Sequence, residues 1–166
     1  GCNHKGDFKI AKEMIKVAAN FCNVDVVKFQ KRNNKELLGE VGYTEPHPNP
    51  IHSYGDTYGQ HRDFLEFNIE QHKELKEYCN KKEILFFATP FDEFSLEVLS
   101  EVGVDLLKLA SFDLGNLPFV NRVAALGKPT VISIGGGNLS QIKASIEILL
   151  SKNVETAILH CVSEYP

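Results

Sequence analysis

The sequence predicts an α/β fold built around a parallel sheet. Segments with apolar residues at helical spacing alternate along the chain with short, β-branched segments typical of buried strands. Polar residues gather where those predicted strands end. Alternation of this kind requires helical crossovers between parallel strands, as in a (β/α)₈ barrel or an open doubly wound sheet. The pattern alone leaves both architectures open.

Composition limits the class of protein. The 166 residues are 43% hydrophobic and 24% charged, which is enough for one domain with one core over residues 1–166. A net charge of −4 excludes a global basic field, so we expect neither nucleic-acid binding nor attraction to a membrane surface. The sequence has no apolar run near membrane-spanning length and no export signal, and we therefore expect a cytoplasmic protein.

The first third of the chain predicts a helix, a strand and a long loop. Asp7 can cap a helix over residues 8–21, which leads into a strand at 25–30. Residues 39–68 are rich in Gly, Pro, Tyr and His and show no sustained period. We expect this stretch to be an irregular loop of the kind that serves as a functional lid or remains disordered.

The rest of the chain predicts regular alternation. Helices are expected over 69–82, 95–103, 117–126 and 138–151. Strands are expected over 84–90, 104–111, 129–135 and 154–161. Gly103 is placed to end one helix, and Asn138 with Gln141 resembles a capping box at the start of another.

The stretch DLLKLASFD, residues 105–113, places Lys108 inside a predicted buried strand. A buried charge costs several kcal/mol unless a partner compensates for it. Similar polar residues end the other strands: Lys28, Gln30, Thr89, Ser111, Ser133, His160, Ser163 and Tyr165. Because the carboxyl ends of parallel strands lie on one side of a sheet, we expect the lysines and hydroxyls of this set to share an anionic ligand. His160 is more simply a core histidine bonded to the backbone. A lone strand lysine more often reaches to water, but two in register favour a site.

Four histidines, at positions 47, 52, 61 and 72, raise the question of a metal site. None of these residues is paired with another at the i, i+4 spacing that places two ligands on one helical face. The sequence therefore favours a solvated loop, and we expect no metal ligands within this chain.

A set of linked motifs runs through nearly the whole chain in a fixed order: GCNHKGD, VVKFQKR, SYGDTYGQHRDFLEF, FFATPFD, KLASFDLGNLPFV, GKPTVISIGGG and LHCVSEYP. This set resembles the sialic acid synthases, which condense phosphoenolpyruvate with an N-acetylated amino sugar. The loop and the KLASF form are most similar to the branch that makes pseudaminic, legionaminic and related nonulosonic acids.

The resemblance implies a transferase with a (β/α)₈ TIM barrel. Carbon 3 of phosphoenolpyruvate would attack the open-chain aldehyde of N-acetylmannosamine or a related 6-deoxy diacetamido sugar, with C–O cleavage and release of phosphate. Compared with the family, we expect an incomplete barrel with strands two to six, lacking the first strand, the last two strands and the C-terminal antifreeze-like domain. We expect this chain alone to be inactive.

The resemblance also assigns roles to residues. Lys28, Thr89, Lys108, Ser111, Ser133 and Ser163 would hold phosphoenolpyruvate, and Gln30 and Tyr165 would face the sugar. Asp113 would be catalytic; it stands where the family often has a glutamate, and its side chain is shorter. The family implies a divalent metal, Mn²⁺ or Mg²⁺, with ligands beyond Pro166, and a homodimer.

Two alternative functions stay open at this stage. One is another barrel that condenses phosphoenolpyruvate with an aldose, of the aldulosonate-phosphate synthase type, which uses the same pair of lysines. The other is a relic that binds an anion without chemistry. The sialic acid synthase and the aldulosonate-phosphate synthase differ in whether the accepted sugar is N-acetylated or phosphorylated. Both differ from the relic in that their reading frame must encode the remaining strands.

Overall fold

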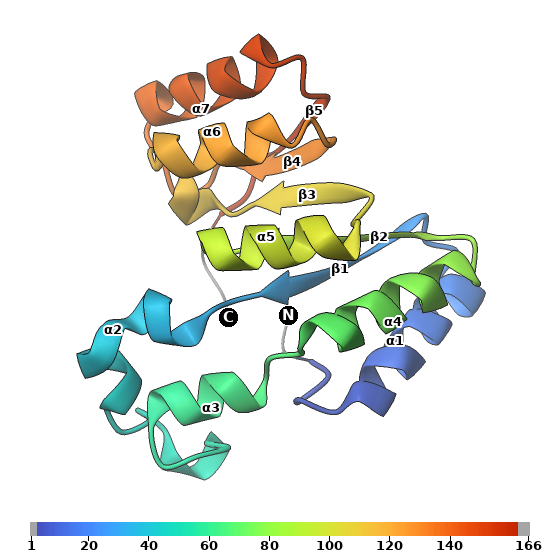
Figure 1. The fold of residues 1–166 in the computed structure, drawn as a ribbon, viewed down its shortest axis with the longest axis vertical. Helices are drawn as coiled ribbons and strands as arrows, with labels where there is room; N and C mark the ends of the chain where they lie inside the picture. The colour runs from blue at the N-terminus through green and yellow to red at the C-terminus, as the bar shows by residue number, and fades with distance from the viewer. Residues whose placement is uncertain (1–2, 163–166) are drawn as a thin grey trace.

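The protein forms a single parallel sheet of five strands with helical connections (Figure 1). The computed structural model describes residues 3–162. Its strands are β1 (Val26–Lys31), β2 (Leu85–Pro90), β3 (Leu106–Leu109), β4 (Thr130–Ser133) and β5 (Thr156–Leu159). They lie in the order β1-β2-β3-β4-β5, and every neighbouring pair is parallel. A doubly wound sheet would reverse its order at a switch point, so this order identifies consecutive strands of a (β/α)₈ barrel.

The helices that the sequence predicts are confirmed to within a few residues. They are α1 (Phe8–Phe21), α4 (Ile69–Asn80), α5 (Glu93–Val102), α6 (Leu117–Ala125) and α7 (Leu139–Ser151). Asp7 caps α1 by accepting hydrogen bonds from two backbone N–H groups. Asn138 and Gln141 form a capping box at the start of α7, and Gly103 ends α5 with a left-handed φ of 73°.

The prediction of an irregular loop over 39–68 is wrong. The segment contains most of α2 (Asn34–Thr44), the 3₁₀ turn η1 (Pro50–His52) and α3 (Tyr58–Phe64). Gly39 breaks the helical conformation inside α2 with a φ of 61°, which hides the helical period in the sequence. Gly59 packs so closely under Tyr43 that a Cβ atom would lie 2.3 Å from the ring, and this contact brings α3 against α2.

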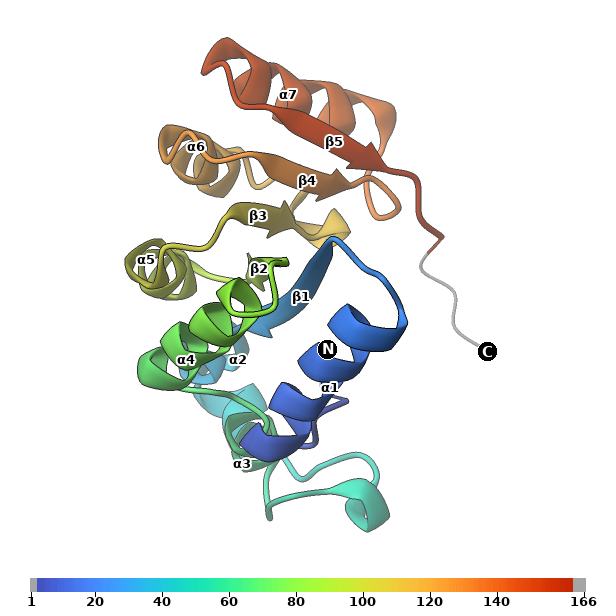
Figure 2. The same cartoon turned by 90° about the vertical axis from the view of Figure 1, so that its right-hand side faces the viewer.

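The two faces of the sheet differ because side chains alternate along each strand. One face, here called the covered face, packs against the helices. It carries the half-buried Val27 and the buried apolar residues Phe29, Phe86, Ala88, Leu107, Leu109 and Ile132. The opposite face, here called the open face, carries the intervening residues: Lys28, Gln30, Phe87, Thr89, Leu106, Lys108, Val131 and Ser133. The helices run along one side of the strands when the molecule is turned (Figure 2).

Among residues 3–162, no helix combines the length and the apolar character needed to cross a bilayer.

Candidate functional site at the carboxyl ends of the strands

The open face collects most of the residues that the sequence predicts as ligands. Strand pairing places Gln30 beside Thr89 and Lys108 beside Val131, so these side chains point to the same side. Ser111 and Asp113 follow β3 in a short 3₁₀ turn, η2 (Ser111–Asp113). The predicted ligands that lie on the open face itself are Lys28, Gln30, Thr89, Lys108 and Ser133. Ser163 and Tyr165 lie outside the described residues.

Lys108 is the most unusual group of the site. It is only 8% exposed, and its Nζ donates a hydrogen bond to the carbonyl oxygen of Leu109 at 2.5 Å. Within the described residues it makes no ion pair. Burial, followed by the positive charge of Lys28, lowers the pKa of Lys108 to about 8. The ammonium group is therefore costly in the unliganded protein and suited to an anion.

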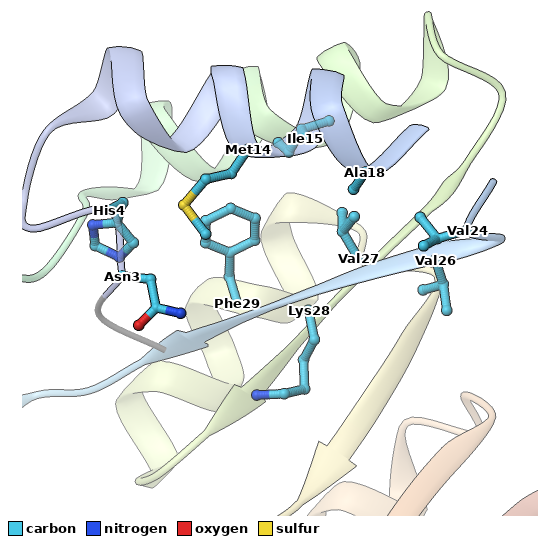
Figure 3. A pocket seen from close by; sticks show the side chains of 10 residues that line it. All are labelled: Asn3, His4, Met14, Ile15, Ala18, Val24, Val26, Val27, Lys28 and Phe29. Atoms are coloured by element: carbon cyan, nitrogen blue, oxygen red, sulfur yellow. The ribbon is translucent and has the colours of Figure 1, made fainter. Parts of the chain in front are cut away.

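Lys28 lies at the outer edge of the sheet. Figure 3 shows its side chain leaving β1 on the side opposite to Val27, Phe29 and helix α1. Burial and the nearby charge of Arg32 both lower the pKa of Lys28. The chain around Lys28 also borders a cavity of about 280 Å³ between α1 and β1, lined on the helix side by Met14, Ile15 and Ala18. The Lys28 side chain is nevertheless partly open to solvent, and its charge is close enough to Lys108 to lower the pKa of that residue.

Asp113 carries a carboxyl group without a hydrogen-bond partner for one of its oxygens. The residue is 2% exposed, and no described residue bonds to Oδ2. Burial raises the pKa of Asp113 to about 7, against a smaller opposing effect of a backbone hydrogen bond at Ala110 and of Lys108. A carboxyl group with a pKa near 7 can both give and take a proton at physiological pH.

The glycine-rich turn after β4 touches the segments that follow β3 and β5. A Cβ atom on Gly136 would lie 2.9 Å from the carbonyl oxygen of Ser111, and one on Gly135 would lie 2.3 Å from that of Cys161. The Gly135 N–H also donates to Cys161 Sγ at 3.2 Å. Only glycine allows this approach, which draws the ends of three strands together around the open face.

The histidines do not assemble into a cluster. His72 is fully buried on α4, where its Nδ1 lies 2.9 Å from the carbonyl oxygen of Asn68 and burial lowers its pKa. The rings of His47 and of His61, which belongs to α3, have centroids 4.3 Å apart. Residues 3–162 contain no group of three or more His, Cys, Asp or Glu side chains that could hold a metal ion.

Sequence reasoning missed a group of residues beside Gln30. Arg32 Nη2 donates to Gln30 Oε1 at 2.9 Å, and the guanidinium Cζ lies 3.9 Å from the centroid of the Phe91 ring. Glu66 accepts from the backbone N–H of Arg32 at 3.0 Å. The signal was available, since Arg32 stands two residues after Gln30 at the end of a predicted strand and therefore on the same side.

The family follows from a direct comparison. A family model described as the NeuB family matches residues 14–166. The chain belongs to this family. N-acetylneuraminate-9-phosphate synthase of Mus musculus is 37% identical to this chain, and the match covers the whole of this chain and 46% of the length of the mouse protein. N,N'-diacetyllegionaminic acid synthase of Campylobacter jejuni is 33% identical, and the match covers the whole of this chain and 50% of the length of that protein.

A solved structure supports the same placement. The crystal structure of N-acetylneuraminic acid synthetase from Leptospira borgpetersenii, in complex with citrate, matches with a TM-score of 0.83 and 34% identity. The match covers 100% of this chain and 53% of that one. This NeuB-family chain therefore spans about half the length of the relatives it matches.

Proposed function

We propose that the full-length protein is a nonulosonic acid synthase that condenses phosphoenolpyruvate with the open-chain aldehyde of an N-acetylated amino sugar and releases phosphate. The observation that carries this proposal is Lys108, a buried ammonium group on the open face with a lowered pKa and no acidic partner in ion-pair range within residues 3–162. An anionic substrate supplies the missing charge. The relatives named as sialic and legionaminic acid synthases support the choice of substrates.

The open face suits phosphoenolpyruvate in both charge and geometry. Lys28 and Lys108 provide two positive charges for its phosphate and carboxylate groups. Thr89, Ser111 and Ser133 provide hydroxyl donors around them, and Ser163 would add a further one. Gln30, at the end of β1, would contact the sugar together with Tyr165.

Asp113 fits the proton transfers of this reaction. Carbon 3 of phosphoenolpyruvate forms a bond to the aldehyde carbon, and the aldehyde oxygen then takes a proton, which the neutral Asp113 can donate. Water adds at carbon 2 and loses a proton, which restores the neutral acid. The tetrahedral intermediate then breaks its C–O bond to phosphate, which takes the proton of the carbon 2 hydroxyl as the ketone forms. The pKa of about 7 and the unpartnered Oδ2 support this cycle despite the short side chain.

The remaining parts of the proposal concern the rest of the protein. The described residues do not provide a suitable ligand set for Mn²⁺ or Mg²⁺. We expect the ligands beyond Pro166, and we expect a cytoplasmic homodimer.

The test is phosphate release by the full-length protein with phosphoenolpyruvate and Mn²⁺. The sugars are N-acetylmannosamine and 6-deoxy diacetamido sugars, each with and without a phosphate group, and arabinose 5-phosphate. Release with an N-acetylated sugar is the expected result. Release with arabinose 5-phosphate alone would replace the proposal with an aldulosonate-phosphate synthase. Binding of phosphoenolpyruvate without release would favour an anion-binding relic.

A further inference from the structure

We propose that Arg32 is a positioning residue that holds the Gln30 amide so that Gln30 offers only hydrogen-bond donors to the amino sugar. This inference deepens the proposed function and rests on it for the identity of the ligand. Its structural basis is the hydrogen bond from Arg32 Nη2 to Gln30 Oε1, at 2.9 Å.

The chemistry of arginine determines which way the Gln30 amide points. A guanidinium group has five N–H donors, no acceptor, and no accessible neutral form. Rotating the amide by half a turn would place its NH₂ group against the donors of Arg32. The oxygen of Gln30 therefore faces Arg32, and the NH₂ group is left for whatever occupies the open face beside Thr89.

Arg32 is itself held from several directions, which makes it a rigid support. Its side chain is 15% exposed, with Nη1 3.6 Å from Glu66 Oε1. The guanidinium lies over the Phe91 ring at 3.9 Å. Phe91 in turn stacks on Phe112, with centroids 5.5 Å apart and an interplanar angle of 11°. Because these residues follow β1, β2 and β3, the stack crosses three strand ends.

The consequence is a rule for the substrate. A ligand group that faces Gln30 must be a hydrogen-bond acceptor, such as the carbonyl oxygen of an acetamido group or a hydroxyl oxygen. The positive charge of Arg32, which also lowers the pKa of Lys28, favours the same polarity. A group that can only donate would leave the half-buried amide unsatisfied and would be disfavoured.

The kinetic test uses the full-length protein with Arg32→Ala, Arg32→Lys and Gln30→Glu. Arg32→Ala should raise KM for the amino sugar about tenfold, because the freed Gln30 amide no longer holds its donors toward the sugar, and a tenfold change corresponds to about 1.4 kcal/mol. KM for phosphoenolpyruvate should change less than threefold. Arg32→Lys should recover little, since lysine lacks the planar fork. Gln30→Glu keeps the bond to Arg32 but replaces the donors with an acceptor, and it should raise KM as much as Arg32→Ala.

Arg122→Ala is the matched control, because Arg122 pairs with Glu93 and Glu97 on helices of the covered side. It should leave both KM values unchanged. Equal rises in the two KM values for Arg32→Ala, or no rise for the sugar, would overturn the inference.

A second measurement decides the inference even if no amino sugar is turned over. In protein labelled with ¹⁵N-glutamine, the side-chain NH₂ signal of Gln30 is assigned by its loss in Gln30→Glu. Arg32→Ala should shift and broaden that signal, while Phe91→Leu, which removes only the stacking ring, should shift it less. An unchanged Gln30 signal in Arg32→Ala would show that Arg32 does not hold the amide. Failure of turnover with a shifted signal would count against the synthase and not against Arg32.

Discussion

The covered face and the open face of the sheet are made by the same strands and do different work. Phe86 and Phe87 are neighbours in β2, yet Phe86 is fully buried under the helices, whereas Phe87 pairs with Lys28 on the open face. On β3, Leu107 and Leu109 belong to the core, and Lys108 between them makes no ion pair with any described residue. A period of two residues thus separates the core side chains from those that we propose bind the ligand, so single substitutions can test either face alone.

The largest effect is expected on the covered face. Phe86→Ala should lower the free energy of unfolding of the full-length protein by about 3–5 kcal/mol, because it leaves a cavity in a close-packed core. Phe87→Ala makes the same chemical change on the open face and should cost clearly less. Urea denaturation of both variants checks the comparison. Equal losses of stability would mean that the two faces are not distinct.

The pH dependence of stability should show a minimum near neutral pH. The pKa of Lys108 is lowered from 10.5 to about 8 by folding, so its charged form disfavours the folded state by roughly 3 kcal/mol. The neutral form carries no such penalty, so the folded state is most stable above the unfolded pKa of 10.5. This extra stability is lost as the pH falls from there through about 8. The pKa of Asp113 is raised from 3.8 to about 7, so its contribution is present at low pH and is lost as the pH rises through about 7.

The measurement is the unfolding free energy of the full-length protein at a series of pH values from about 5 to about 10, a range that includes the folded-state pKa values of Lys108 and Asp113. Lys108→Met should flatten the increase in unfolding free energy above pH 8. Asp113→Asn should flatten the decrease in unfolding free energy that occurs as the pH rises toward 7. A profile that is the same in both variants as in the wild type would contradict the burial of the two groups.

Lys108→Met should separate binding from folding. Affinity for phosphoenolpyruvate, measured by calorimetry at pH 7, should fall by about 10- to 100-fold, since hydrogen bonds to charged groups contribute about 1.5–3 kcal/mol. Stability should stay the same or rise, because the change removes a buried charge that has no ion pair among residues 3–162. Lys152→Met, at an exposed position after α7, is the control for loss of charge. Unchanged affinity in Lys108→Met would refute the assignment of the site.

The smallest effect is expected for Ser133→Ala. A single neutral hydrogen bond is worth about 1 kcal/mol, so affinity for phosphoenolpyruvate should fall about fivefold with little change in stability. Ser151→Ala, in the last turn of α7, removes a hydroxyl that bonds only to the helix backbone and serves as the control. A loss as large as that of Lys108→Met would indicate that Ser133 supports the site as a whole.

Much of the architecture could be predicted from periodicity because the helices and strands between residues 69 and 159 have clean patterns and proper caps. The α2–α3 segment could not, because its helices are short and Gly39 interrupts one of them. The TxxQ capping box at Thr57 was a visible but overlooked signal for α3.

The site was predictable in composition but not in chemistry. Strand ends identify Lys28, Thr89 and Lys108 because parallel strands share a carboxyl edge. The raised pKa of Asp113 depends on its burial in η2, which no local pattern encodes. The hydrogen bond from Arg32 to Gln30 depends on a guanidinium position that Phe91 and Glu66 support, and these two residues come from distant parts of the chain.

The two margins of the sheet carry different protection against unwanted association. β1 has Lys28 at its margin, and a charge at that place discourages pairing with another strand. β5 pairs only with β4 among the described residues, and its Ile158 and Leu159 are 50% and 47% exposed. When the 166-residue chain is prepared by itself, aggregation should therefore begin at β5. A lysine at position 158 should improve its solubility more than any change along β1.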